Sequence, residues 1–402
     1  MIVNVERSMD ITNIEVKFIT SIDQVCCDDW NSIVDTSYPF VQHQFLYALE
    51  SSGSVCQVTG WQPNHLLVYQ DDLLIAVMPL YIKSHSYGEY VFDFQWANAY
   101  HQSGFEYYPK LLSAIPFTPC SGVRLAIKSS CPSNIQSIII EKIIDYAQGL
   151  GLSSWHLLFP KNKISLQKNA LGFIQRLGMQ YHWFNKNYHS FDDFLECCKM
   201  KRRKNIKRER KLVKDSGVKL QIVEGVDIDK NLWQRFFYFY QRTYVKRSGN
   251  AGYLNQEFFE KAGETMASNI MMVVAKSLIP ESLTPESDEA SSEEIIAIAL
   301  FFKDDNNLYG RYWGADSEYD FLHFETCYYQ GIEYCIEKKL QHFDAGAQGE
   351  HKIQRGFEPI ETYSYHWIND QRFGEAIRNF VVEEAEYVKQ GINQLKKKLP
   401  FK

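Results

Sequence analysis

Five titratable side chains stand close together near position 350, among residues with little or no side chain. They are Asp344, Glu350, His351, Lys352 and Arg355, and the sequence between them is rich in alanine and glycine. Carboxylate and imidazole groups can exchange protons, whereas lysine and arginine can stabilise an anion. Small residues let a ligand or a backbone segment approach closely. The pattern indicates a site for chemistry, although a glycine-rich strand connection with solvated charges has the same composition.

A metal ion is one alternative for this segment, because Asp344, Glu350 and His351 all carry metal-ligating atoms. Adjacent Glu and His residues are common in loops, and no second histidine stands at ligand spacing. We therefore predict no metal site.

The segment follows a helix and a strand that would position it. Apolar residues recur every three or four positions from Phe324 to Ile336, which is typical of a helix with one buried face. The pattern then changes, and residues 341–344 resemble a strand that enters the core. The polar side chains would lie just beyond the end of that strand.

A second polar cluster stands in an aromatic-rich stretch of the first half. Glu89 and Asp93 lie there beside His85 and Tyr87. Such residues can line a cleft and bind a substrate, or they can satisfy one another around a loop.

A strongly basic run occupies residues 199–214, with ten Lys or Arg against one acid, Glu209. It contains no helix breaker, so we predict a long exposed helix. Such a face attracts phosphate oxygens of an RNA, a nucleotide cofactor or an anionic lipid headgroup. A solvated linker helix that pairs with acids elsewhere is the alternative. The predicted phosphate-binding residues are Lys201, Arg202, Arg203 and Lys204.

Length and composition limit the class of protein. A chain of 402 residues exceeds one ordinary core, so two domains are expected. The net charge of −6 argues against a globally basic nucleic-acid binder, and 15% aromatic residues argue against disorder. Nine cysteines without CxxC spacing favour free thiols in a reducing cytoplasm. No apolar run reaches membrane length, so we predict a cytoplasmic protein without a membrane span.

The order of expected elements repeats along the chain. The tripeptide Tyr-His-Trp at 181–183 recurs at 365–367. Each time it lies in an expected strand that follows a helix, a strand and a further helical or looped stretch. In the first copy we expect this further stretch to be a helix at 166–177. We predict an α/β fold of two similar units joined by a basic helix. The predicted boundaries are 14–190 for the first unit, 191–217 for the basic linker helix, 218–402 for the second unit and 277–294 for a disordered insertion.

Several long motifs accompany this order: HSYGEYVFDFQWANAY, KRRKNIKRER, LYGRYWG, LHFETCYYQGIEY and FDAGAQGEHKIQRGF. Together they resemble a bacterial family of predicted N-acyltransferases, also described as peptidoglycan-biosynthesis-like. The order of elements is similar to that of two tandem GNAT units, as in FemABX-type transferases. The resemblance covers nearly the whole chain, from about Trp30 to Leu399.

The resemblance implies direct transfer of an acyl or aminoacyl group from an activated donor, acyl-CoA or aminoacyl-tRNA, to an amine of a small molecule or peptide. In GNAT units the donor lies between two splayed strands, here LYGRYWG and QHFDAGA, with its phosphates at the N-terminus of the next helix. The acidic sequence GADSEYDFLHFE before that helix would repel phosphate, which argues against coenzyme A. FemABX-type proteins, which use aminoacyl-tRNA, likewise lack the glycine-rich phosphate loop.

Aminolysis of such a donor requires a base, a group that stabilises the oxyanion, and positioning. Glu350 or His351 is the predicted base, and Lys352 or Arg355 is the predicted positive charge, so the catalytic residues would be Glu350, His351 and Lys352. The predicted substrate-binding residues are Tyr309, Arg311, Tyr312, His323, Glu325, Asp344, Arg355, Glu89 and Asp93.

A function of a different class also fits the sequence. The protein would then be a catalytically silent GNAT-like module that binds tRNA, another RNA or an anionic partner through the basic helix. The sequence predicts no oligomeric state.

Overall fold

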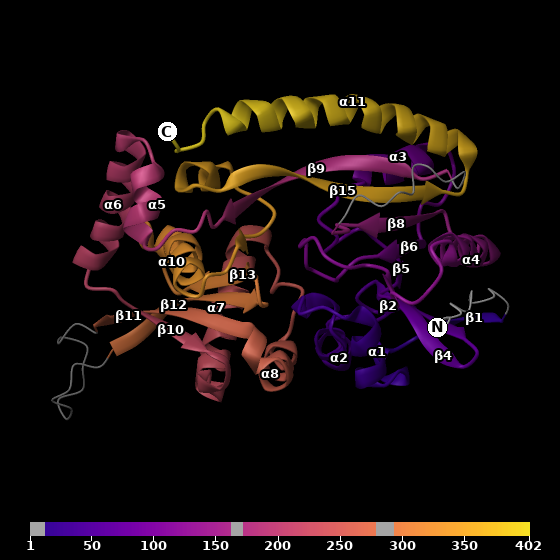
Figure 1. The fold of residues 1–402 in the computed structure, drawn as a ribbon, viewed down its shortest axis with the longest axis horizontal. Coiled ribbons are helices and arrows are strands. Elements are labelled where there is room, and N and C mark those ends of the chain that lie inside the picture. Colours follow the sequence, from indigo (N-terminus) through magenta and orange to yellow (C-terminus); the bar gives the residue numbers. More distant parts are fainter. Residues whose placement is uncertain (1–12, 162–171, 279–292) are drawn as a thin grey trace, which may run out of the picture. The chain divides into compact units, whose positions relative to one another are not determined.

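The structure is a computed structural model that describes residues 13–161, 172–278 and 293–402 (Figure 1). It divides into two compact units. Unit 1 comprises Met1–Thr36, Phe40–Leu177 and Tyr363–Glu384, and unit 2 comprises Ser37–Pro39, Gly178–Thr362 and Ala385–Lys402. The predicted insertion at 277–294 lies outside the described residues except at its ends, which are strand.

Unit 1 contains two sheets. Its own elements are β1 (Ile14–Ile19), α1 (Cys27–Val34), α2 (His43–Ser51), β2 (Trp61–Pro63), β3 (His65–Gln70), β4 (Leu73–Met78), β5 (Tyr81–Lys83), α3 (Phe94–Gln102), β6 (Lys110–Ser113), β7 (Ala126–Ile127), α4 (Ile135–Gly149) and β8 (Ser154–Leu158). One sheet has the antiparallel order β1-β3-β4-β7. The other includes β8-β6-β5-β2, in which β6 and β8 are parallel. The apolar face of α4 packs into the core of this unit.

Unit 2 contains one sheet whose order begins β10-β11-β12-β13-β14. Its own elements are α5 (Phe191–Cys197), α6 (Met200–Asp215), β10 (Lys219–Glu224), α7 (Lys230–Ser248), α8 (Gln256–Thr265), β11 (Ile270–Leu278), β12 (Glu293–Lys303), β13 (Asn307–Ala315), α9 (Leu322–Phe324), a π-helical turn (Glu325–Tyr329), α10 (Gln330–Glu337), β14 (His342–Asp344) and a 3-10 helix (Glu350–Arg355). Neighbouring strands are antiparallel except β13 and β14, which are parallel.

Three elements begin in one unit and end in the other: β9 (Ile174–Phe184), β15 (Glu358–Ile368) and α11 (Gln371–Lys396). The end of β9 pairs antiparallel with β14 in unit 2, and the end of β15 pairs antiparallel with β8 in unit 1. The last strand of the first repeat, β9, therefore ends in unit 2, and the last strand of the second repeat, β15, ends in unit 1. For this reason the compact units have different limits from the boundaries expected at 190 and 217.

The helix expected at 166–177 is wrong where the structure describes it, because Ile174–Leu177 is the start of β9. Ile174 is buried against Trp96 and Ile377, and this packing favours an extended backbone over the local helix pattern. The rest of the expected helix lies outside the described residues.

The predicted helix over 322–336 is confirmed as a continuous run of α9, the π-helical turn and α10. Its apolar face, which includes Tyr328, Ile332 and Cys335, packs with Phe343 of β14 and Phe357 in the core of unit 2. The helix and β14 thus fix the start of the segment 345–355.

Gly314 on β13 is expected to tolerate no side chain. A Cβ atom there would lie 2.3 Å from the backbone carbon of Phe239 on α7. Gly314→Ala should therefore force the helix off the strand and lower the free energy of unfolding by about 1–3 kcal/mol. Gly149→Ala, which meets no atom within 4 Å, is the control. Equal melting temperatures for the two variants would contradict the prediction.

Candidate functional site at the split between β13 and β14

The ladder between the two parallel strands of unit 2 ends where the small residues begin, and this end of the ladder is called the split between β13 and β14. β13 and β14 pair only from Asn307 and His342 to Tyr309 and Asp344. Just beyond this point β13 has a bulge at Arg311, because Leu300 of β12 pairs with Tyr312 and Phe301 pairs with Gly310. The ladder between the two strands therefore ends at Asp344, and Ala345 and Gly346 still lie beside Gly310 of β13. The predicted splaying of these strands stays a prediction.

The chain after β14 turns back over this split. Gly346 and Gly349 have φ angles of 87° and 117°, which favour glycine. The backbone N–H of Gly346 donates to Asp344 Oδ1 at 2.9 Å, and Asp344 lies 3.7 Å from His182 on β9. Asp344 is thus buried and holds the turn, and it is not open to a substrate.

The 3-10 helix Glu350–Arg355 places its neighbouring charged residues in opposite directions. Glu350 and His351 are exposed, whereas Lys352 is buried with 2% of its surface accessible. The Lys352 ammonium donates to the carbonyl oxygen of Gly346 at 2.6 Å and lies 5.9 Å from the centroid of the Tyr328 ring. A positive charge is therefore fixed beside the split strands.

His351 faces the helix that begins at Leu322. Its Nε2 lies 2.9 Å from the hydroxyl of Tyr328, and its ring is 5.5 Å from Phe324 and 6.3 Å from His323. Although His351 is exposed, its contacts with Tyr328 and Phe324 partly desolvate the ring, and this desolvation, followed by the positive charges of Arg355, Lys352 and Arg247, lowers the pKa of His351. Burial, followed by the positive charges of neighbouring basic residues, lowers the pKa of His323 to about 3. Both imidazoles are neutral at neutral pH.

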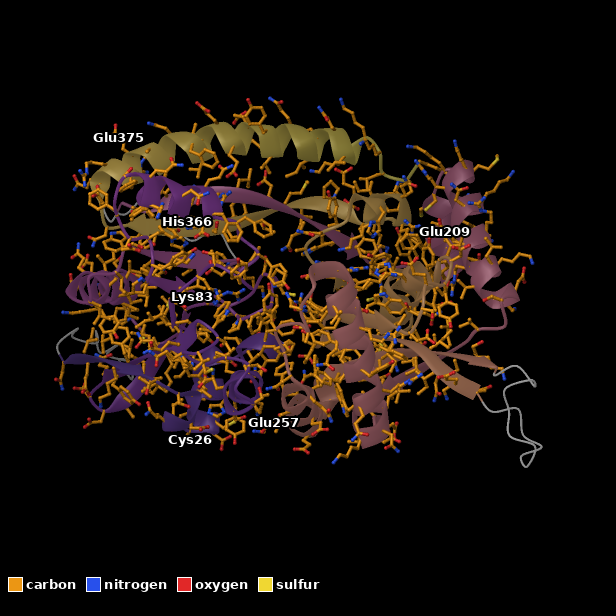
Figure 2. All side chains as sticks on the ribbon, turned by 180° about the vertical axis from the view of Figure 1, so that it is seen from behind. Cys26, Lys83, Glu209, Glu257, His366 and Glu375 are labelled. Atoms are coloured by element: carbon orange, nitrogen blue, oxygen red, sulfur yellow. The ribbon has the colours of Figure 1, made fainter. Side chains whose placement is uncertain are left out.

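Two predicted site residues, Arg355 and Glu325, are engaged in ion pairs with α6. Arg355 pairs with Glu209 at 2.9 Å, and Glu209 also accepts from the hydroxyl of Tyr329. Arg210 pairs with Glu325 at 3.0 Å. Figure 2 labels Glu209 on α6. These pairs hold the basic helix within unit 2, where we had expected a linker between units, and they leave Arg355 and Glu325 no free charge for a ligand.

A pocket of about 1030 Å³ lies against the same helix start. His323 and Phe324 form part of its wall, together with Trp313 of β13. The acidic residues 316–320 and the last turns of α7 form the rest. Lys246 of α7 pairs with Glu318, so part of the negative charge of this loop is neutralised.

The predicted tyrosines of β13 occupy packed positions. The hydroxyl of Tyr309 donates to Asp304 at 2.8 Å. The ring of Tyr312 packs edge-on against Tyr240, at 5.6 Å between centroids, and Arg311 lies over the Tyr312 ring. Of the three, Arg311 stands at the bulge next to the split.

Glu89 and Asp93 form a separate cluster in the interior of unit 1. Both bind the buried ammonium of Lys110, at 2.8 and 2.5 Å. Burial alone would lower the pKa of Lys110, but the charges of Asp93 and Glu89 raise it to about 12. Burial raises the pKa of Glu89 to about 7. In the described part of the chain, only Glu89, Asp93 and His156 have the spacing of a metal site, and Lys110 already supplies a cation there.

The predicted phosphate-binding residues lie along the first turns of α6. Lys201 and Lys204 are exposed. Arg202 donates to Gln354, and Arg203 donates to backbone carbonyls of Glu196 and Cys198. Sequence reasoning missed Tyr328, Lys110 and Arg210. Only Lys110 left a sequence signal, as a lysine at the start of an apolar strand.

All nine cysteines lie in the described residues and are free thiols. Within the described ranges, the structure contains no helix that combines the length and apolarity needed to cross a bilayer.

Comparisons with solved structures give chains that are similar over most of their length. The crystal structure of FemX superposes with a TM-score of 0.53 and 13% identity, over 88% of this chain and 98% of that chain. A conserved protein of unknown function from Bacteroides thetaiotaomicron gives a TM-score of 0.49 and 8% identity, over 88% and 100% of the two chains. A tandem GNAT protein from the clavulanic acid biosynthesis pathway gives 0.42 and 8%, over 88% and 98%. No curated protein matches the chain.

The likeness to FemX confirms the predicted fold class, an α/β chain of two GNAT-like units. A family model described as FemAB_like, peptidoglycan biosynthesis/recognition, matches residues 21–402. The match covers the whole of the split between β13 and β14 and nearly all of the chain. The protein belongs to the FemAB-like family.

Proposed function

We propose that the protein is an N-acyltransferase that transfers an aminoacyl or acyl group from an activated donor to an amine. The donor carbonyl would lie at the split between β13 and β14. One observation carries this proposal, namely the buried ammonium of Lys352, which the carbonyl oxygen of Gly346 holds beside the end of the β13–β14 ladder. Membership in the FemAB-like family supports the same reaction class.

Lys352 is the proposed oxyanion-stabilising group. Attack of an amine on an ester or thioester places negative charge on the carbonyl oxygen, and a fixed cation in a site with little water stabilises that charge. Arg355 is less suited to this role because Glu209 neutralises it. The hydrogen bond to Gly346 keeps the ammonium in position before the donor arrives.

His351 is the proposed base, in preference to Glu350. A base must be unprotonated to accept the proton of the attacking amine, and the lowered pKa of His351 satisfies this condition at neutral pH. The hydroxyl of Tyr328 at 2.9 Å orients the imidazole. His323, also neutral, lies between His351 and the pocket and would contact the donor.

We propose aminoacyl-tRNA as the donor in preference to acyl-CoA. The pocket beside His323 is lined by Asp316, Glu318 and Asp320 and also by Arg242, Lys246 and Arg247 of α7, so its wall carries charges of both signs. The carboxylates suit the ammonium of an aminoacyl group, and the acidic segment 316–320 stands before the helix start at which a coenzyme A site would bind its phosphates. The proposed acceptor is a peptide amine of the peptidoglycan type, which rests on the description of the family.

The test is a transfer assay with both donors. The protein is incubated with tRNA charged with labelled amino acids, or with acyl-CoA, and with an amine-bearing peptidoglycan peptide, and products are identified by mass spectrometry. We expect a new amide from charged tRNA. An amide from acyl-CoA alone would reverse the choice of donor. Binding of tRNA without any transfer would instead support the non-catalytic alternative.

The pH dependence of the reaction should identify the base. Since His351 has a lowered pKa, kcat/KM should decline only when the pH falls below the usual histidine range, where the imidazole becomes protonated. His351→Gln should remove this decline and reduce the rate by about 10²-fold or more. Glu350→Gln is the matched control and should retain both the decline at acidic pH and the rate of the wild type. Loss of the acidic limb in Glu350→Gln would assign the base to Glu350.

A further inference from the structure

The structure brings together two basic segments that are about two hundred residues apart in the sequence. The backbone N–H of Lys199, just before α6, donates to Pro400 O at 2.7 Å, and that of Lys402 donates to Cys197 O at 3.0 Å. Cys198 and Phe401 form an antiparallel bridge. Figure 1 accordingly marks the C end beside α5 and α6. The segment 399–402 is thereby fixed against Cys197–Lys199, which lead directly into α6.

This contact creates a surface with many cations. We define the basic surface as Lys201, Lys204, Lys396, Lys397, Lys398 and Lys402, all of which are exposed. Within the portion of the chain that the structure describes, none of these side chains forms an ion pair or hydrogen bond. Other lysines of α6 differ, since Lys207 pairs with Asp192 and Lys211 pairs with Asp215. The exposed acid closest in sequence is Glu196 on α5.

The charge of this surface is opposite in sign to the net charge of the whole molecule. The chain carries a net charge of −6, so six unneutralised lysines in one place make it strongly asymmetric. An asymmetric molecule approaches an anionic partner in one orientation, with its cations forward. The basic surface is therefore suited to a partner of high negative charge density.

An exposed apolar side chain stands among these cations. Met200, between Lys199 and Lys201, has 70% of its surface accessible, and Phe401 is partly exposed next to Lys402. Cations around an apolar side chain suit a bilayer, where lysines meet lipid phosphates and the apolar group enters the headgroup region. Proteins that bind single-stranded RNA stack exposed aromatic rings on bases, and α6 contains no aromatic residue.

We propose that the basic surface docks the protein on a membrane that contains anionic phospholipids, with Met200 inserted among the headgroups. The inference is independent of the proposed acyl transfer, because it uses no residue of the split between β13 and β14. Glu209 and Arg210 of the basic run form ion pairs within unit 2, but these pairs do not explain its exposed lysines. The proposal gives those lysines a role.

The test is co-sedimentation of the full chain with vesicles. The wild-type protein should bind vesicles of equal parts phosphatidylglycerol and phosphatidylcholine, and should not bind phosphatidylcholine alone. Binding should weaken steeply as salt shortens the Debye length from about 10 Å at 0.1 M. The variant K201E/K204E/K398E should reduce binding at least about tenfold, and Met200→Ser should reduce it less.

The matched control is K128E/K142E/K161E, which changes the net charge equally at exposed lysines of unit 1. It should retain vesicle binding. Circular dichroism and melting temperature establish that each variant is folded. Equal binding to phosphatidylcholine vesicles, or an equal loss in both triple variants, would overturn the proposal. Loss of tRNA binding in K201E/K204E/K398E with unchanged vesicle binding would assign the surface to nucleic acid instead.

Discussion

Lys110→Met is expected to destabilise unit 1 by roughly 3–5 kcal/mol. The ammonium of Lys110 is the shared partner of Glu89 and Asp93, and it also donates to Ser86. Methionine matches the lysine in shape but leaves one or two carboxylates buried without a counter-charge. Each of these carboxylates already has one oxygen without a hydrogen-bond partner, and Asp93 would keep only the neutral hydroxyl of Tyr107, at 2.6 Å, as a donor among the described side chains that the structure pairs with it at hydrogen-bond distance.

Lys83→Met is the informative control, because Lys83 is the neighbour of Lys110 across the β5–β6 ladder. Lys83 is also fully buried, but its ammonium lies 3.7 Å from the centroid of the Trp61 ring and, within the described ranges, donates only to the Tyr87 carbonyl. Burial, opposed by the charge of Glu89, lowers the pKa of Lys83 to about 7. Since the lowered pKa means that burial of the charge costs stability, Lys83→Met should be at least as stable as the wild type at neutral pH.

The effect of Lys83 should also depend on pH with a definite sign. Its pKa is lower in the folded protein than in the unfolded chain, so the unfolded chain binds more protons between pH 7 and the usual lysine pKa of 10.5. The cost of burying the charge is therefore complete below pH 7 and disappears as the pH rises to 10.5. Any stability that Lys83→Met gains over the wild type should shrink across this range.

The measurement for both lysines is hydrogen exchange of peptides that carry β5 and β6, together with thermal unfolding. Fast exchange in Lys110→Met and slow exchange in Lys83→Met are expected. If Lys110→Met exchanged as slowly as the wild type, the cluster would contribute little to stability. The carboxylates would then be satisfied by groups other than the lysine.

Lys352→Met is expected to reduce kcat by about 10²- to 10³-fold. The lost charge acts on the oxyanion, which exists only in the transition state, so KM should change much less than kcat. Lys352→Arg keeps the charge, but its planar guanidinium is broader than the ammonium that donates to the carbonyl oxygen of Gly346 at 2.6 Å. Partial activity of Lys352→Arg would therefore indicate a role for charge.

A structural role of Lys352 must be separated from a catalytic one, because this side chain also anchors the turn at Gly346. Melting temperature and binding of charged tRNA serve this purpose, with the exposed Lys230→Met as a neutral reference. A folded Lys352→Met variant that binds donor but transfers poorly supports the proposal. Full activity in that variant would refute it, whereas loss of both folding and donor binding would make Lys352 structural.

The sequence permits accurate prediction where a local pattern and the tertiary environment agree. The helix after Leu322 and the small residues after Asp344 are of this kind, because apolar period and side-chain size report directly on burial and close approach. The same reasoning failed for Ile174–Leu177, where packing against distant residues determines the backbone.

Contacts between distant charges could not be predicted in this way. Glu325 and Arg355 are as polar as any active-site residue, and only the positions of Arg210 and Glu209, more than a hundred residues away, reveal that they are ion-paired. Lys352 and His351 are adjacent in the sequence and differ in burial, because a 3-10 helix turns one inward and one outward.

The exchange of β9 and β15 also bears on the evolutionary origin of the chain. In the present chain the end of each repeat's last strand, β9 or β15, pairs with a strand of the other repeat. Two copies of a half-length ancestor that traded these strands would have formed a domain-swapped homodimer. Gene fusion then converts an association that depends on concentration into an intramolecular one. A repeat expressed alone is therefore expected to expose the edge of β8 or β14 that the other repeat covers here.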